Sequence, residues 1–145
     1  MQARVAVVGA VALGLGAGLA TLALRPLAVA PARVCNPPAE IMSRLELLFG
    51  MGRKGGGEVS EDEWRTFLDA EVTPRFPDGL TVLTGYGQWR NAAGALAKET
   101  SRVLVIWAKP APEVQASIEL IRAAWKTRFQ QESVMRVDSA SCVSF

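Results

Sequence analysis

The chain has 145 residues, among them 16 Lys and Arg, 14 Asp and Glu, two Cys and no His. Without His the chain cannot use Ser-His or Cys-His catalysis or bind a metal through imidazole, and two Cys alone cannot close a tetrahedral zinc site. The net charge of +2 is too small for a nucleic-acid-binding surface, and an apolar content of 50% indicates a folded protein. We therefore expect no metal site, no cofactor and no nucleic-acid partner.

The N-terminal segment has the pattern of an export signal. A run of uncharged, mostly apolar residues, 5–24, follows Arg4, and the run is also long enough to span a bilayer. Ala30-Pro31-Ala32 provides small residues for a cleavage site. Residues 1–32 are therefore expected to be either a cleaved signal peptide or a retained N-terminal hydrophobic export helix that anchors the chain in the inner membrane through residues 5–24. In both cases residues 33–145 lie outside the cytoplasm, in the periplasm or another extracytoplasmic space.

The strands and helices expected after a linker over residues 33–42 follow from the spacing of apolar residues. Alternating apolar residues predict strands, helical spacing predicts helices, and Gly, Pro, Asn and Asp mark the turns between them. The expected order is β-α-β-β-α-β, over residues 44–49, 60–72, 80–90, 103–107, 114–129 and 134–138. This order predicts an α+β fold for residues 43–145. It is a ferredoxin-like sandwich, in which two helices cover one face of an antiparallel sheet with strand order 4-1-3-2.

The register between the first and last strands is predicted from the matching of charges. If Glu46 lies opposite Arg136, then Arg44 lies opposite Asp138, and opposite charges meet on the helix-free face. Apolar residues of both strands then meet on the face that packs against the helices. A shift by one residue would turn charges towards the core, so we predict this register.

The two cysteines flank the predicted sheet. Cys35 precedes the first strand and Cys142 follows the last, and antiparallel pairing of these strands brings both cysteines to the same end of the sheet. Because disulfides form and persist outside the cytoplasm, the predicted export favours a Cys35–Cys142 disulfide over two free buried thiols.

A glycine-rich segment after the first strand, residues 50–55, matches the G-x-G-x-x-G pattern of phosphate-binding loops. The next helix begins only at Ser60, and its first turn carries three acids, Glu61, Asp62 and Glu63. These acids would repel a phosphate at the helix N-terminus. We therefore expect a mobile loop and no nucleotide at this motif.

The strongest candidate for a ligand-binding site lies where three segments should converge at one edge of the sheet. The glycine loop, the end of the second strand and the connection into the last strand contribute Arg53, Trp89, Arg90, Gln131 and Glu132. An exposed aromatic ring near cations, amides and a carboxylate is typical of a site for a polar or anionic ligand. In the alternative interpretation Trp89 covers the core, and Arg90 and Glu132 are solvated or paired. No residue is singled out as catalytic.

Five segments of the chain resemble the bacterial family called domain of unknown function 3574, namely residues 46–50, 73–82, 87–90, 131–134 and 142–145. The run Thr-Pro-Arg-Phe-Pro-Asp-Gly-Leu in the second segment is the most specific of them. The resemblance implies a small exported bacterial envelope protein, often resembling a lipoprotein. It implies no established activity, so no catalytic residue is carried over from it.

Two functions are compatible with these features. The leading expectation is a non-enzymatic envelope protein, a binding or structural module, because the chain lacks His, a metal-binding cluster and an activated nucleophile. The alternative is a small ligand-binding protein or an enzyme that uses the edge formed by Trp89, Arg90 and Glu132. In one version of this alternative the protein is a homodimer whose sheets face each other.

Overall fold

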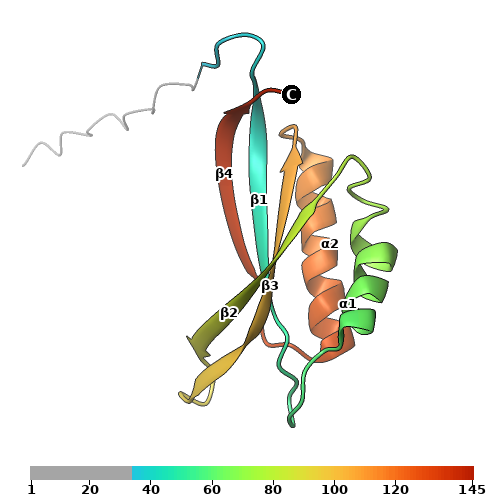
Figure 1. The fold of residues 1–145 in the computed structure, drawn as a ribbon, viewed down its shortest axis with the longest axis vertical. Helices are drawn as coiled ribbons and strands as arrows, with labels where there is room; N and C mark the ends of the chain where they lie inside the picture. The colour runs from blue at the N-terminus through green and yellow to red at the C-terminus, as the bar shows by residue number, and fades with distance from the viewer. Residues whose placement is uncertain (1–33) are drawn as a thin grey trace, which may run out of the picture. The chain divides into compact units, whose positions relative to one another are not determined.

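Residues 34–145 are described by the structure, which is a computed structural model (Figure 1). The strands and helices follow the predicted order as β1 (Glu40–Gly50), α1 (Glu61–Phe67), β2 (Thr81–Arg90), β3 (Leu96–Ala108), α2 (Pro112–Phe129) and β4 (Met135–Val143). A π-helical turn, η1 (Leu68–Val72), continues α1. The export helix expected over residues 5–24 lies outside the described residues. Within residues 34–145 no helix combines the length and the apolar character that crossing a membrane requires.

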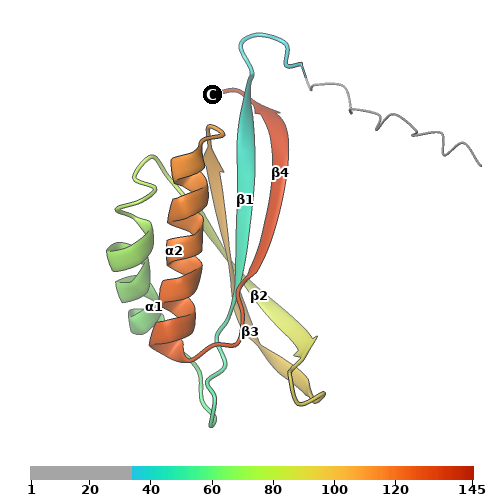
Figure 2. The ribbon, with the colours of Figure 1, turned by 180° about the vertical axis from the view of Figure 1, so that it is seen from behind.

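The four strands form one antiparallel sheet in the order β2-β3-β1-β4, which is the predicted order 4-1-3-2 read from the other edge. Both helices lie on the same side of this sheet in two opposite views (Figures 1 and 2). The α+β fold and the strand order are therefore confirmed. β1 begins at Glu40, so the last residues of the expected linker 33–42 belong to the sheet.

The core lies between the sheet and the two helices and is rich in aromatic rings. Phe49 of β1 packs edge-on against Trp125 of α2 and Trp64 of α1, with ring centroids 4.9 and 5.3 Å apart. A capping box starts α1, because the Ser60 hydroxyl accepts from the Glu63 amide and the Glu63 carboxylate accepts from the Ser60 amide. Leu45, Leu47 and Phe49 face the helices, as the alternation in the sequence predicts.

The predicted register of β4 against β1 is wrong by one residue. Glu46 lies opposite Val137, and Leu47 lies opposite Arg136. The shift turns the two charged residues of β4 towards the helices, while Met135 and Val137 point to the helix-free face. The charge ladder expected between β1 and β4 therefore does not exist, and Arg44 pairs instead with Glu46 on its own strand, at 2.9 Å.

The observed register is possible because β4 is an edge strand. The Arg136 side chain extends past the border of the sheet to α2, where its Nη1 donates to the Glu119 carboxylate at 2.8 Å. Its Nε donates to Asp138 at 3.0 Å. The hydrogen bond from Arg136 lowers the pKa of Glu119. A charge that faces the helices is costly in a central strand, but at the edge it finds partners and remains near water.

This network yields a test of the register in the form of two double-mutant cycles. Glu119→Gln and Arg136→Met should show a coupling of about 0.5–1 kcal/mol in the free energy of unfolding, because the pair is partly exposed to solvent. Glu46→Gln with Arg136→Met serves as the control and should show no coupling, since these residues are not opposite each other. Urea unfolding of the three single variants, the two double variants and the wild type measures both values. A coupling in the control cycle alone would restore the register that the charges predicted.

The predicted disulfide is confirmed. Cys35 and Cys142 are bonded, with Cα atoms 5.5 Å apart and a sequence separation of 107 residues. The bond lies at the end of the β1–β4 pair, where Ile41 is opposite Cys142. It joins the segment before β1 to the last strand and thereby closes a loop that contains almost the whole domain.

Removing this bond should destabilise the domain. In the chain-entropy description a loop of this length contributes roughly 5 kcal/mol, so Cys142→Ser should lower the urea midpoint strongly. Reduced wild-type protein should unfold at the same midpoint as this variant, and Ser144→Ala, a change beside the bond, should not shift it. Two reactive thiols in protein purified without reductant would show that the bond does not form.

Candidate functional site

A hollow of about 220 Å³ lies on the helix-free face of the sheet, near the end of β1. Strand alternation places most of its lining strand residues, such as Leu48, Glu99 and Met135, on the face opposite to Leu47. Gly50 of β1 and Gly87 of β2 carry no side chain, which leaves room above them for the side chains of Glu99 and Ser101. Apolar and polar side chains from the four strands and from the α2–β4 connection surround it, among them Leu48, Trp89, Glu99, Ser101, Gln131, Ser133 and Met135.

The carboxylate of Glu99 is held in the hollow by two short hydrogen bonds. Its Oε1 accepts a hydrogen bond from the indole N–H of Trp89 at 2.6 Å, and its Oε2 accepts one from the backbone N–H of Gly52 at 2.7 Å. A Cβ atom on Gly52 would lie only 2.8 Å from Oε2, and one on Gly50 would lie closer still to Glu99. The absence of side chains at 50 and 52 is therefore what allows the carboxylate to approach the backbone.

This contact gives the glycine motif of residues 50–55 a role different from that of a phosphate loop. Its first two glycines accommodate a carboxylate that comes from β3. The segment was expected to be a mobile loop, but it forms a short hairpin in which Arg53 N–H donates to Gly57 O at 2.9 Å and Val59 N–H donates to Met51 O at 2.7 Å. The backbone N–H of Gly52 remains available for Glu99 because it points away from this hairpin's own hydrogen bonds.

Trp89 and Gln131, two of the residues expected to bind a ligand, line the hollow. The Gln131 amide donates to the carbonyl of Gly52, which ties the α2–β4 connection to the glycine hairpin. Arg90 and Glu132 do not line it. Arg90 donates to the Gly94 carbonyl at 2.7 Å within its own hairpin, and Glu132 accepts from a backbone amide of the same turn at 3.3 Å.

Arg53, the other expected cation, is engaged in a structural ion pair. Its guanidinium donates to both oxygens of Glu63, each at 2.6 Å, and it lies 5.7 Å from the ring centroid of Phe129. The hydrogen bond from Arg53, together with those from Ser60, lowers the pKa of Glu63 to about 2. The two cations that were expected to attract an anion are thus hydrogen-bonded to other groups.

Glu99 was not among the predicted site residues, because nothing in the local sequence marks it. It lies in a polar stretch of β3, which extends well beyond the apolar run 103–107 that was predicted as a strand. The signal that would find it is the hairpin register: counting outwards from the turn at 91–95 places Glu99 opposite Gly87 and diagonal to Trp89.

The hollow contains no Lys or Arg among the described residues, so the charge of Glu99 is not balanced within it. Each carboxylate oxygen uses one lone pair for its protein donor and keeps a second one. Chemically, such a group can hold a cation beside the indole of Trp89, or accept a proton from a bound molecule. No cluster of Cys, Asp and Glu within residues 34–145 is arranged to hold a metal ion.

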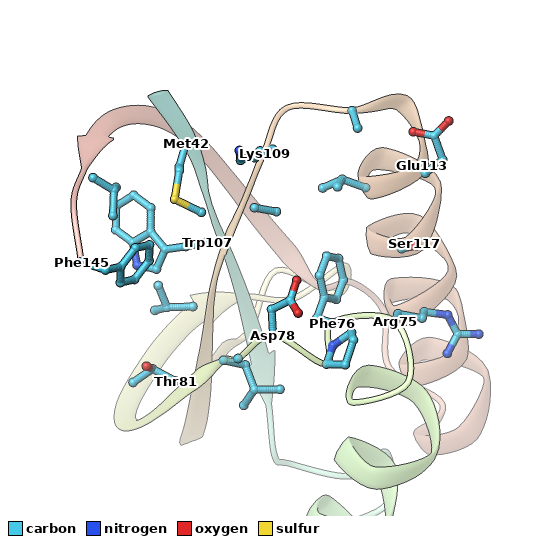
Figure 3. Close-up of a pocket in the computed structure, with 18 residues that line it drawn as sticks. Met42, Arg75, Phe76, Asp78, Thr81, Trp107, Lys109, Glu113, Ser117 and Phe145 are labelled. Carbon is cyan, nitrogen blue, oxygen red and sulfur yellow. The ribbon is translucent and has the colours of Figure 1, made fainter. Parts of the chain in front are cut away.

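A larger groove, of about 870 Å³, lies at the opposite end of the sheet (Figure 3). Met42, Trp107 and Phe145 gather on one side of it, and Glu113 and Ser117 of α2 lie on the other. Phe76 and Asp78, from the loop that leads into β2, lie between the two sides. The volume is sufficient for a metabolite.

The charged groups of this groove are less well arranged to bind a ligand than Glu99 is. Its two cations are already paired, Arg75 with Glu71 at 3.1 Å and Lys109 with Glu40 at 2.8 Å. Asp78 and Glu113 have no hydrogen-bond or ion-pair partner among the described residues, and both are exposed at the rim. Among the described residues, no charged side chain of the groove is both held by hydrogen bonds and free of an ion-pair partner, so the hollow is the better candidate for a site with defined chemistry.

Solved structures with the same fold include a phage SAM lyase in complex with S-methyl-5′-thioadenosine. The likeness has a TM-score of 0.55 at 12% sequence identity and covers 80% of this chain and 97% of the lyase chain. The same phage lyase in its apo state matches with a TM-score of 0.50 at 13% identity, over 74% of this chain and 92% of the lyase chain. At this level of identity the likeness shows a shared fold.

The expectation of a non-enzymatic binding or structural module is contradicted by this finding. The two solved structures described above belong to an enzyme, and one of them has a small molecule bound. The absence of His and of a metal cluster, on which that expectation rested, excludes particular kinds of catalysis but not catalysis by a carboxylate. The alternative, a small ligand-binding protein or an enzyme, agrees better with the fold.

The remaining comparisons concern the chain itself. No curated protein matches it. Residues 44–145, which run from β1 to the C-terminus, match the family described as protein of unknown function (DUF3574). The match includes every strand and helix around the hollow and confirms the resemblance seen in the sequence. The chain therefore belongs to the DUF3574 family.

Proposed function

We propose that this protein is an enzyme for a small organic cation, and that its substrate binds in the hollow with the positive centre beside Glu99. The observation that carries the proposal is the unbalanced carboxylate, held by the Trp89 indole and the Gly52 amide at 2.6 and 2.7 Å. A carboxylate that is fixed before a ligand arrives loses little conformational freedom on binding, and its charge acts at a defined point.

The charges around the hollow favour a cationic ligand. The sequence had instead suggested a polar or anionic ligand. Arg53 and Arg90, the two cations expected to attract an anion, make hydrogen bonds to other groups of the protein. Glu99 belongs to no ion pair within residues 34–145 and lies next to an aromatic ring. A sulfonium or ammonium group would find both the opposite charge and a π surface there.

The fold agrees with this class of substrate. The phage lyase that shares it acts on SAM, and SAM carries a sulfonium centre. The hollow of about 220 Å³ is large enough for the charged centre of such a molecule but not for all of it, so the rest would extend along the helix-free face. We therefore propose a sulfonium or a similarly substituted ammonium compound as the substrate class.

Calorimetry with SAM tests the proposal directly. The full chain should bind SAM, and Glu99→Gln should weaken binding by about 10- to 100-fold, because the variant keeps the shape but loses the charge. Glu132→Gln is the matched control and should bind as the wild type does, since Glu132 lies outside the lining. S-methyl-5′-thioadenosine has no sulfonium charge, so its weaker binding should respond little to Glu99→Gln. If Glu132→Gln impairs binding and Glu99→Gln does not, the ligand occupies the predicted edge instead.

A second pair of variants tests the geometry without altering any charge. Gly52→Ala should displace the Glu99 carboxylate and weaken SAM binding, because the new Cβ would lie 2.8 Å from Oε2. Gly87→Ala in the same hollow should be tolerated in folding, since its Cβ would be 3.6 Å from the nearest atom, an ordinary contact. Equal binding by Gly52→Ala and wild type would show that the position of the carboxylate does not matter.

We also propose that the domain works outside the cytoplasm. The apolar run 5–24 supports export, and the Cys35–Cys142 bond fits an oxidising compartment. A reporter enzyme that is active only in the cytoplasm, fused after Phe145, should therefore be inactive in the native host. Full reporter activity would contradict export, and the intact mass of the purified protein would distinguish a cleaved signal peptide from a retained anchor.

A further inference from the structure

The helix-free face of the sheet is unusually apolar for a surface in contact with water. In β4 the usual pattern is inverted, because Arg136 and Asp138 point to the helix side while Met135 and Val137 point outwards. Met135 is 59% exposed and Val137 is 43% exposed. Leu83 of β2 lies on the same face with 51% of its surface exposed. An antiparallel sheet with one wet face normally alternates in the opposite sense, so this face has the composition of a covered surface.

The charges on this face are self-complementary. Arg44 and Glu46 stand two residues apart on β1, at the centre of the face, and form an ion pair at 2.9 Å. Arg44 also lies 5.7 Å from the ring centroid of Trp107. With the two helix-free faces stacked, a two-fold axis that runs between the sheets at the level of Leu45, perpendicular to β1, places Arg44 of one copy opposite Glu46 of the other. The same rotation places Leu48 opposite Met42, so apolar residues meet on both sides of the charges.

We propose that the protein forms a two-fold homodimer through the helix-free faces of its sheets, with Arg44 of each copy against Glu46 of the other. The occupant is a second copy of this chain, because one face presents both the apolar residues and the two halves of the charge pattern that an isologous interface needs. An axis parallel to β1 would instead set Arg44 against Arg44, which is unfavourable.

The dimer also completes the candidate site, an inference that rests on the proposed function. The hollow opens on the helix-free face near Leu48 and Gly50. In the two-fold arrangement the end of the second sheet that carries Met42 lies over it. The hollow of one copy is then closed by the other, which removes water from around Glu99 and strengthens its attraction for a cation.

Matched leucine variants of the full chain test the interface by sedimentation across a dilution series, with no ligand present. The wild type should sediment as a dimer, and Leu83→Glu should raise the dimer dissociation constant by about tenfold or more, because it buries an unpaired charge. Leu120→Glu is the control, since Leu120 is similarly exposed, at 56%, but lies on α2. A monomeric wild type, or equal dissociation constants for the two variants, would overturn the dimer.

Charge exchange identifies the pairing even if Leu83→Glu fails to fold. Arg44→Glu alone and Glu46→Arg alone should each be monomeric, because residues 44 and 46 that meet across the interface then carry like charges. An equal mixture of the two variants should form a heterodimer, since opposite charges meet again. Absence of the heterodimer would overturn the proposed pairing. These measurements contain no ligand, so the dimer and the proposed function are tested separately. A dimer that does not bind SAM would support the interface and contradict the proposed function. A monomer that binds SAM through Glu99 would contradict only the dimer.

Discussion

The arrangement of this domain depends on the packing of Phe49 between the two helices. Its ring contacts Trp64, Phe67 and Trp125, with centroids 4.9 to 6.0 Å apart, so one residue of β1 joins both helices to the sheet. Strand geometry then determines the face of the sheet on which the next residue, Gly50, lies. Because side chains alternate along a strand, Gly50 faces away from the helices, and the space above it is where Glu99 lies. The same alternation that builds the core on one face thus creates the hollow on the other.

The parts of the structure that could be predicted from the sequence are those that many residues specify together. The stripes of α1 and α2 and the alternation of Leu45, Leu47 and Phe49 each repeat a pattern several times, and the capping box at Ser60 adds a local signal. The position of the cysteines followed from the strand order. The apolar patterns, the capping box and the strand order all specify the same fold, so each prediction supported the others.

The parts that could not be predicted depend on where a residue stands in the finished sheet. The register of β4 was misjudged because the rule that charges face away from a core holds for central strands, whereas Arg136 reaches Glu119 around the edge. Glu99 was missed because its importance comes from Trp89 and Gly52, which are 10 and 47 residues away in the chain. Arg53, conversely, looked like a ligand for an anion but serves to hold the first turn of α1 through Glu63.

The Cys35–Cys142 bond has a consequence for the integrity of the chain. The two ends of the domain are covalently joined, and the 107-residue separation places every loop, including the glycine hairpin and the turn at 91–95, inside the closed ring. A protease that cuts any one of these loops opens the ring but does not divide the molecule, because the two pieces are still linked through sulfur. The strands beside the cut therefore stay at high local concentration and can keep their pairing, so a single cleavage does not release a fragment.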